Sequence, residues 1–219
     1  TRTAMANPKQ AINPLNGYLD HTLLKPDLTA DQMHAGCQHT IDHHFAGICL
    51  PPAYVKQANE YLADRKAKVI TVIGFPLGYQ KIGTKTEEAR LALDDGADEL
   101  DMVLNISAFK SGASSYVRED IDSIVQLTHR TNKLVKVIID ACRICADNKV
   151  DFVKTCTGFN GGQATVQDVQ LMHENLPAHT KIKASGGIKD TTTAWNLIES
   201  GADRLGTSSS LRLVADEAV

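Results

Sequence analysis

The sequence predicts a single α/β domain built as a (β/α)8 TIM barrel, and three observations support this fold class. Short β-branched segments alternate with segments of helical periodicity, which is typical of parallel sheets with crossover helices. Eight such strand segments occur in a chain of 219 residues, a length at which barrels of this kind form one domain. No G-x-G-x-x-G sequence follows the first strand, which argues against the alternative of a doubly wound dinucleotide-binding sheet.

Each strand is assigned from its β-branched composition, and each helix start from a capping residue. The predicted strands are Tyr18–Thr22, Gly47–Leu50, Lys68–Ile73, Glu99–Val103, Leu134–Ile139, Asp151–Lys154, Lys181–Ala184 and Arg204–Thr207. Helix starts are indicated at Thr29, Thr84, Thr165 and Asp190. The tripeptide Gly-Ala-Asp recurs at residues 96–98 and 201–203, where a glycine C-cap is expected to end a helix and lead into the next strand.

The connection between the fifth and sixth strands is unusually short. Only residues 141–151 separate Asp140 from Phe152, whereas a parallel crossover needs about a dozen residues or more. Either one outer helix has been lost or the sequence omits a segment, and the omission is favoured because a missing helix would expose apolar sheet. Residues 1–17 are expected to be an N-terminal extension or capping segment, and residues 18–219 the single catalytic domain.

Composition excludes several classes of function. The net charge is −3, with 23 basic and 26 acidic residues interspersed, which argues against a nucleic-acid-binding surface. No apolar stretch reaches the roughly 18 residues of a membrane span, and the N-terminal residues lack the apolar core of a secretory signal. An odd number of cysteines, five, is not typical of a disulfide framework, so we expect a cytoplasmic protein.

Two lysines interrupt apolar strand segments and carry the functional prediction. Lys154 lies in the sixth predicted strand and Lys183 in the seventh. A buried ammonium is costly, so each lysine is either a structural salt-bridge partner or is kept partly neutral. A neutral amine is a nucleophile suited to imine formation with an aldehyde or ketone. On neighbouring strands each lysine would lower the pKa of the other, with one as nucleophile and one as electrostatic modulator; the pattern does not say which.

Carboxylates accompany these lysines at the expected C-terminal ends of the strands, where such barrels place their active sites. Asp20 and Thr22 close the first strand, and Asp101 lies inside the fourth. A structural, capping role for Asp101 is the alternative to a barrel-facing carboxylate that shares a charge network with the lysines and relays protons. Lys136, between two valines of the fifth strand, is equally compatible with an outward, solvated side chain and is not assigned to the site.

Glycine-bearing loops follow the last three strands and predict a phosphate site. They are Thr157–Gly162, Ser185–Ile188 and Gly206–Ser210. Barrels often bind phosphate with backbone N–H groups of the loops after strands seven and eight, and Ser208 and Ser209 add hydroxyl donors.

Several segments together resemble the deoxyribose-phosphate aldolase family. They are Leu19–Pro26, Val72–Gly78, Ala97–Val103, Phe152–Phe159, Lys183–Gly187 and Gly206–Ser209. The resemblance runs from about Gly17 to Leu211 and is interrupted only at the short crossover. It implies a class I aldolase that reversibly cleaves 2-deoxy-D-ribose 5-phosphate to D-glyceraldehyde 3-phosphate and acetaldehyde.

The resemblance also implies roles for individual residues. Lys154 matches the Schiff-base lysine, Lys183 the lysine that lowers its pKa, Asp101 the acid/base carboxylate and Asp20 an assisting aspartate. The phosphate positions matched are Gly158, Gly186, Gly187, Ser208 and Ser209, and the pocket is expected to include Thr22, Cys49 and Thr157. Phe159 stands where the family often has a basic residue, so phosphate affinity is expected to depend more on N–H groups. Carbon–carbon cleavage is expected between C3 and C4.

No metal and no cofactor is expected, because a protonated imine replaces the Lewis acid. The expected partners are small molecules, with no nucleic acid or membrane, and a homodimer is possible by resemblance. Two alternatives stay open: another Schiff-base aldolase of the same fold, and a catalytically silent barrel that binds a sugar phosphate. A zinc site at His39, His43 and His44 and a redox role for Cys142 and Cys145 are considered and not favoured.

Overall fold

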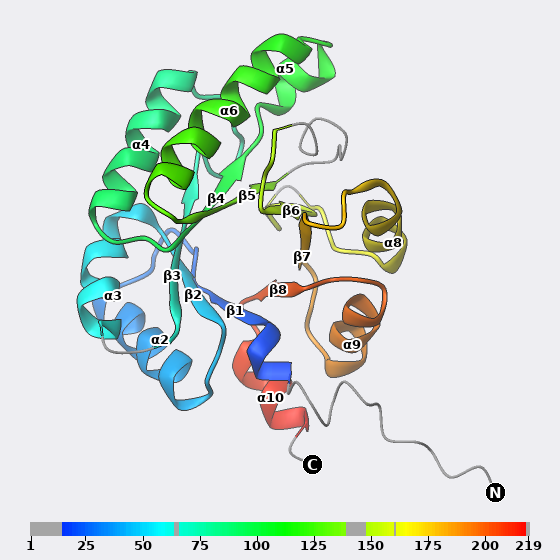
Figure 1. Cartoon of the computed structure of the whole chain (residues 1–219). Coiled ribbons are helices and arrows are strands. Elements are labelled where there is room, and N and C mark those ends of the chain that lie inside the picture. The colour runs from blue at the N-terminus through cyan, green and yellow to red at the C-terminus, as the bar shows by residue number, and fades with distance from the viewer. Residues whose placement is uncertain (1–14, 64–65, 139–147, 160, 218–219) are drawn as a thin grey trace, which may run out of the picture.

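The computed structural model describes residues 15–63, 66–138, 148–159 and 161–217. Eight parallel strands close into a barrel in the order in which they occur along the chain, and helices surround it (Figure 1). The strands are β1 (Leu19–Thr22), β2 (Gly47–Leu50), β3 (Lys68–Ile73), β4 (Glu99–Val103), β5 (Leu134–Ile138), β6 (Phe152–Lys154), β7 (Lys181–Ser185) and β8 (Arg204–Thr207). The predicted (β/α)8 barrel is confirmed, with strand ends that differ by at most one residue.

The described helices alternate with these strands. They are α2 (Ala30–Asp42), α3 (Val55–Leu62), α4 (Ile82–Asp94), α5 (Ile106–Lys110), α6 (Ser114–Arg130), α8 (Val166–Asn175), α9 (Thr191–Glu199) and α10 (Ser210–Glu217), with short 3-10 turns η1 (Leu15–Tyr18) and η2 (Pro52–Tyr54). No helix in the described ranges is long and apolar enough to cross a membrane.

Side-chain caps begin three of the helices as predicted. The side chains of Thr29, Thr165 and Asp190 each accept a hydrogen bond from a backbone N–H of the first turn. The helix expected to start near Thr84 begins two residues earlier, at Ile82, without a side-chain cap.

The two Gly-Ala-Asp tripeptides perform the same task at two places in the barrel. Gly96 and Gly201 follow helix ends with φ of +99° and +118°, a conformation that glycine adopts without steric cost. The aspartate that follows accepts a hydrogen bond from a neighbouring strand: Asp98 from the Val69 N–H at 3.1 Å and Asp203 from the Ile182 N–H at 2.9 Å. These loops therefore fix the helix-to-strand connections in position against the sheet.

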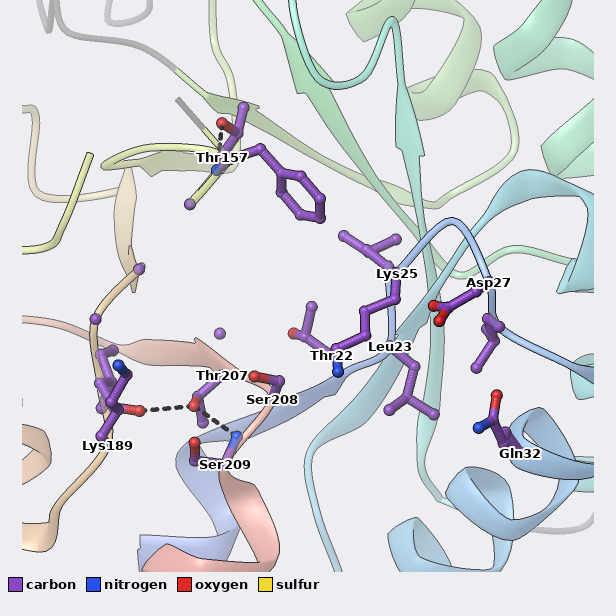
Figure 2. A pocket seen from close by; sticks show the side chains of 18 residues that line it. Thr22, Leu23, Lys25, Asp27, Gln32, Thr157, Lys189, Thr207, Ser208 and Ser209 are labelled. Atoms are coloured by element: carbon purple, nitrogen blue, oxygen red, sulfur yellow. Dashed lines mark hydrogen bonds between the residues drawn. The ribbon is translucent and has the colours of Figure 1, made fainter. Parts of the chain in front are cut away.

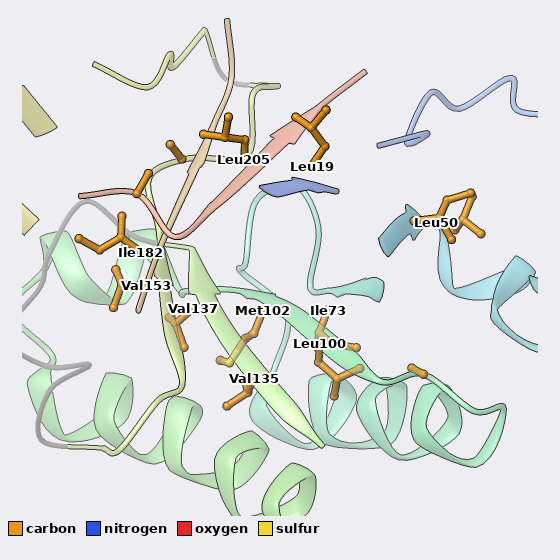
Figure 3. Packing of buried hydrophobic residues seen from close by; sticks show 14 of the residues in the cluster. Leu19, Leu50, Ile73, Leu100, Met102, Val135, Val137, Val153, Ile182 and Leu205 are labelled. Atoms are coloured by element: carbon orange, nitrogen blue, oxygen red, sulfur yellow. The ribbon is translucent and has the colours of Figure 1, made fainter. Parts of the chain in front are cut away.

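The main apolar core lies between the strands and the helices rather than inside the barrel. Outward-facing residues such as Leu100, Val137 and Leu205 are fully buried in it (Figure 3). A second, smaller cluster of Cys49, Ile70 and Val72 is packed with Leu24 and Phe75. Both faces of each strand are thus covered, as expected for a parallel sheet.

The fifth and sixth strands pair directly in spite of the short connection between them. Lys136 is in register with Phe152 and Ile138 with Lys154. Residues 139–147 of the connection, which include Asp140, Cys142 and Cys145, lie outside the described residues. Residues 1–14 also lie outside them, so the expected N-terminal extension stays a prediction.

Candidate active site

The barrel interior contains a group of charged side chains contributed by six strands. Because side chains two apart share a strand face, Phe152 and Lys154 of β6 both point inward, as do Glu99 and Asp101 of β4. β6 is in register with β7 so that Lys154 lies directly opposite Lys183. The expected juxtaposition of the two lysines on neighbouring strands is therefore confirmed.

Asp101 is the centre of this group. Its Oδ2 accepts hydrogen bonds from Lys154 Nζ at 2.9 Å and from Lys183 Nζ at 3.0 Å. Its Oδ1 accepts from Lys136 Nζ at 3.0 Å. Burial alone would raise the pKa of Asp101, but the three lysines outweigh that effect and keep the pKa well below its usual range. Asp101 is thus a carboxylate that can accept a proton.

Asp20 lies on the other side of Lys183 and reinforces its charge. Lys183 Nζ is 2.6 Å from Asp20 Oδ2, and Arg204 donates to Asp20 Oδ1 at 2.6 Å. Burial opposes the charge of Lys183, but Asp101 and Asp20 together raise the pKa of this lysine above its ordinary value. The expectation that each lysine lowers the pKa of the other is therefore wrong for Lys183, because two carboxylates surround it.

Exposure separates the two lysines. The Lys154 side chain is 4% exposed, whereas the side chains of Lys183 and Asp101 are 0% exposed. Lys154 is the last residue of β6 and so lies at the C-terminal end of the barrel, beside the loops. Of the two lysines, Lys154 is thus the more exposed.

Gly206 makes room for Lys183. A Cβ at this position would lie 2.5 Å from Ser185 Oγ and 3.0 Å from Lys183 Cε. A residue larger than glycine at position 206 would therefore displace Lys183 from Asp101 and Asp20.

Three charged residues that the sequence analysis did not select belong to the same group. Lys136 is fully buried and pairs with Glu99 as well as with Asp101. Arg204 reaches Glu99 at 3.4 Å. The alternative of an outward, solvated Lys136 is wrong, because both faces of β5 are covered and this position of the alternation faces the barrel. The same pattern, a lysine between two apolar residues, had selected Lys183 and could have selected Lys136.

A cavity of about 660 Å³ lies at the C-terminal ends of β1, β6, β7 and β8, and Lys154, Lys183, Asp101 and Asp20 are not among the described residues that line it. It is lined by residues that the sequence analysis named, Thr22, Thr157, Gly158, Gly186, Gly187, Ser208 and Ser209 (Figure 2). Lys189 lines the same wall as the glycine loops, and Lys25, Asp27 and Gln32 lie across from it in Figure 2. Lys25 and Lys189 were not predicted, although Lys25 lies within the segment Leu19–Pro26 and Lys189 directly follows the loop Ser185–Ile188.

Local hydrogen bonds shape the wall of this cavity. Thr207 Oγ1 donates to the Ile188 carbonyl at 2.8 Å and accepts from the Ser209 N–H at 2.9 Å, so it joins the loops after β7 and β8 (Figure 2). Gly186 has φ of +93°, and a Cβ there would lie 2.8 Å from the Gly162 carbonyl oxygen. Helix α10 begins at Ser210, so its N-terminal N–H groups lie beside Ser208 and Ser209. The positive end of a helix dipole and close backbone approach both favour an anion at this wall.

Cys49 is fully buried in the smaller apolar cluster, close to the charged group. Like the two lysines, it is not among the described residues that line this cavity, so its expected place in the pocket stays a prediction. Burial raises the pKa of its thiol to about 11, so the thiol stays protonated at neutral pH.

The histidines near the end of α2 pack as aromatic rings. His39 contacts His21 edge to face with ring centroids 6.1 Å apart, and His43 stacks on Phe45 at 5.5 Å. Within the described ranges, no group of three or more His, Cys, Asp or Glu side chains could hold a metal ion.

Comparison with known proteins gives a consistent result. Residues 17–207 match the family described as DeoC/LacD family aldolase. The chain is 46% identical over 210 residues to the deoxyribose-phosphate aldolase of Thermococcus gammatolerans, covering 90% of this chain and 93% of that protein. It is 44% identical over 211 residues to the deoxyribose-phosphate aldolase of Brevibacillus brevis, covering 91% of this chain and 95% of that protein.

The fold of this chain is also similar to that of a solved structure. The tetrameric deoxyribose phosphate aldolase of Aeropyrum pernix has a TM-score of 0.87 to this chain at 28% identity, covering 93% of this chain and 91% of that one. The homodimer and the cytoplasmic location expected for this chain stay predictions.

Proposed function

This chain belongs to the DeoC/LacD family of aldolases, and from that premise we propose that it cleaves 2-deoxy-D-ribose 5-phosphate to D-glyceraldehyde 3-phosphate and acetaldehyde through a Schiff base on Lys154. The observation that carries the proposal is the pairing of Lys154 with Lys183 on one oxygen of Asp101. Lys183 is firmly protonated by its two carboxylates, which leaves Lys154 as the candidate nucleophile. The reaction is reversible, and the enzyme is a carbon–carbon lyase of the aldolase class.

The chemistry begins at the aldehyde carbon of the open-chain sugar. The neutral amine of Lys154 attacks C1, and loss of water gives a protonated imine that serves as an electron sink. Removal of the proton from the C3 hydroxyl then breaks the C2–C3 bond, releases D-glyceraldehyde 3-phosphate and leaves an enamine on Lys154. The bond is C2–C3 rather than the C3–C4 bond expected above, because acetaldehyde contains only two carbons. Protonation of the enamine and addition of water release acetaldehyde and restore the amine.

The charges around Lys154 support this sequence of steps. Asp101 is a carboxylate within 2.9 Å of Lys154 Nζ and can exchange protons with the reacting atoms. Lys183 is an ammonium hydrogen-bonded to the same oxygen, so it disfavours a second positive charge nearby. Asp20 keeps Lys183 charged and in position.

Reductive trapping tests the nucleophile directly. Incubation with acetaldehyde followed by borohydride reduction is expected to leave an ethyl group on Lys154, because the imine forms there. Peptide mass spectrometry identifies the modified residue. Modification of Lys183 in place of Lys154 would exchange their roles, and absence of any interior label would favour the silent sugar-phosphate barrel instead.

The phosphate is expected to bind at the wall formed by Gly158, Gly186, Gly187 and the N-terminus of α10, with Lys189 supplying charge. We therefore expect kcat/KM for 2-deoxyribose 5-phosphate to exceed that for 2-deoxyribose. Lys189→Ala should lower kcat/KM for the phosphorylated sugar about tenfold, the loss of one charged hydrogen bond, and leave that for the free sugar unchanged. Lys56→Ala, an exposed lysine of α3, is the matched control. Equal loss on both sugars would remove Lys189 from the phosphate site.

A further inference from the structure

The ion pairs inside the barrel form a closed ring, and Lys154 lies outside it. The ring alternates in charge and runs in the order Asp101, Lys136, Glu99, Arg204, Asp20, Lys183 and back to Asp101. It contains three cations and three carboxylates and is therefore neutral as a unit. Lys154 joins it only through Asp101 Oδ2, an oxygen that Lys183 already occupies.

The ring extends along the barrel axis, away from the reacting end. Glu99 and Arg204 are the first residues of β4 and β8, whereas Lys154 is the last residue of β6. Arg204 is the most exposed member, at 15%, and the others are 0–2% exposed. Phe152 separates the two ends, with Lys136 Nζ 5.6 Å and the Arg204 guanidinium 5.9 Å from its ring centre.

We propose that Glu99, Lys136 and Arg204 are positioning residues whose charges complete the ring and so set the protonation of Lys154: the two cations disfavour an ammonium there, and Glu99 holds them in place and offsets part of their effect. This inference rests on the proposed role of Lys154 as nucleophile. With the ring intact, each carboxylate already has two cationic partners from within the ring. An ammonium on Lys154 would share Asp101 Oδ2 with Lys183 and would give the otherwise neutral group a net positive charge, which a buried site disfavours.

The other seven strands supply the polar groups and apolar side chains of this interior. The polar groups are Asp20 on β1, Cys49 on β2, Glu99 and Asp101 on β4, Lys136 on β5, Lys183 on β7 and Arg204 on β8. β3 contributes the apolar Ile70 and Val72, which pack with Cys49. Cys49 adds no charge at neutral pH, because its pKa is raised to about 11 by burial. The net charge around Lys154 at neutral pH is thus set by the six ring residues.

Lys136 has a second task, which is the orientation of Asp101. Its Nζ bonds Oδ1 at 3.0 Å and so directs Oδ2 toward Lys154 and Lys183. Glu99, at the N-terminal end of β4, in turn pairs with Lys136. Without Lys136, Asp101 Oδ1 would lose its cationic partner and the group would carry one positive charge fewer, which favours an ammonium on Lys154.

Substitutions of opposite charge are expected to move the titration of Lys154 in opposite directions. The rate of reductive trapping by acetaldehyde and cyanoborohydride is measured from pH 5 to pH 10, and the Lys154 peptide is quantified by mass spectrometry. Lys136→Met removes a ring cation, so the midpoint should move upward by about one to three pH units. Glu99→Gln removes a ring carboxylate, so the midpoint should move downward.

Two controls make the experiment decisive. Lys136→Arg keeps the positive charge and is expected to return the midpoint to that of the parent chain. Lys85→Met removes a lysine that is equally buried but pairs with Asp120 outside the barrel, and it should leave the midpoint unchanged. If Lys136→Met does not fold, Arg204→Gln, whose side chain is partly exposed, should give the same upward shift.

The outcomes separate this inference from the proposed function. If acetaldehyde labels Lys154 in the parent chain but Lys136→Met and Glu99→Gln shift the midpoint in one direction, or not at all, the role of the ring is overturned while the Schiff base stands. If Lys154 is not labelled in the parent chain, the proposed function itself fails. Opposite shifts with rescue by Lys136→Arg establish the ring as a positioning device.

Discussion

Lys154→Met is expected to reduce kcat/KM for cleavage of 2-deoxyribose 5-phosphate by at least about 10⁴-fold, the scale of loss when a covalent nucleophile is removed. Methionine has a similar length but no nitrogen, so the imine cannot form. Lys183 cannot replace it, because Asp101 and Asp20 keep that amine protonated. The release of D-glyceraldehyde 3-phosphate, followed with a coupled dehydrogenase, measures the effect.

The same variant should fold as well as the parent chain. Removal of Lys154 leaves the neutral ring of six charges intact, and Met fills the same volume at the end of β6. Urea unfolding is therefore expected to give a free energy equal to or above that of the parent. Lys181→Met, an exposed lysine at the start of β7, is the activity control. Substantial residual cleavage by Lys154→Met would mean that another group forms the covalent intermediate.

The sequence predicts the barrel well because its strands are short and strongly marked. β2, β3, β4 and β8 have the predicted bounds, and β2 and β3 end directly before a residue that interrupts strands, Pro51 and Gly74. The start of α4 is less predictable, because Lys81 provides no side-chain cap and the helix begins through backbone geometry alone. Such a start leaves no signature in the residue types.

Only some of the charged residues of the site can be identified from the sequence, and their position in the strands decides which. Residues whose chemistry is unusual for their position, such as Lys154, Lys183 and Asp101, are identifiable from the sequence. Glu99 and Arg204 begin their strands, where charged residues are ordinary and a solvated side chain is equally compatible with the pattern. Their pairing depends on barrel closure, which brings β8 beside β1 and its Arg204 within reach of Asp20. Only the three-dimensional register reveals it.

Closure of the barrel also explains why the pKa of Lys183 is not lowered, as its neighbour Lys154 alone would predict. Two neighbouring lysines, considered alone, lower one another's pKa, and the sequence supplies two such lysines on adjacent strands. Asp20 and Asp101 reach Lys183 from β1 and β4, and their combined attraction exceeds both burial and repulsion. The asymmetry between Lys154 and Lys183 thus arises from the carboxylates rather than from the lysines.

Asp101→Asn is expected to destabilise the fold by about 3–5 kcal/mol at pH 7, the usual cost of removing one partner of a buried ion pair. Lys136, Lys154 and Lys183 all donate to this carboxylate, so its loss leaves the three ring cations facing two carboxylates and removes the acceptor of the Lys154 amine. Urea unfolding gives the free energy, and Asp216→Asn, whose partner Arg212 is largely exposed, should change it by less than about 1 kcal/mol. A similarly small change for Asp101→Asn would contradict a central electrostatic role.

The difference in unfolding free energy between the parent chain and Asp101→Asn depends on pH, and its direction follows from the lowered pKa of Asp101. Its pKa in the folded protein lies below the unfolded value of about 3.9, so the carboxylate stabilises the fold fully above that value. The contribution is lost as the pH falls through the lower, folded pKa. The gap in unfolding free energy between the parent chain and Asp101→Asn should therefore be constant from about pH 5 to pH 7 and narrow below about pH 4. A gap that instead widened in acid would show that Asp101 is protonated in the folded protein, and the neutral ring would then lack one of its three anions.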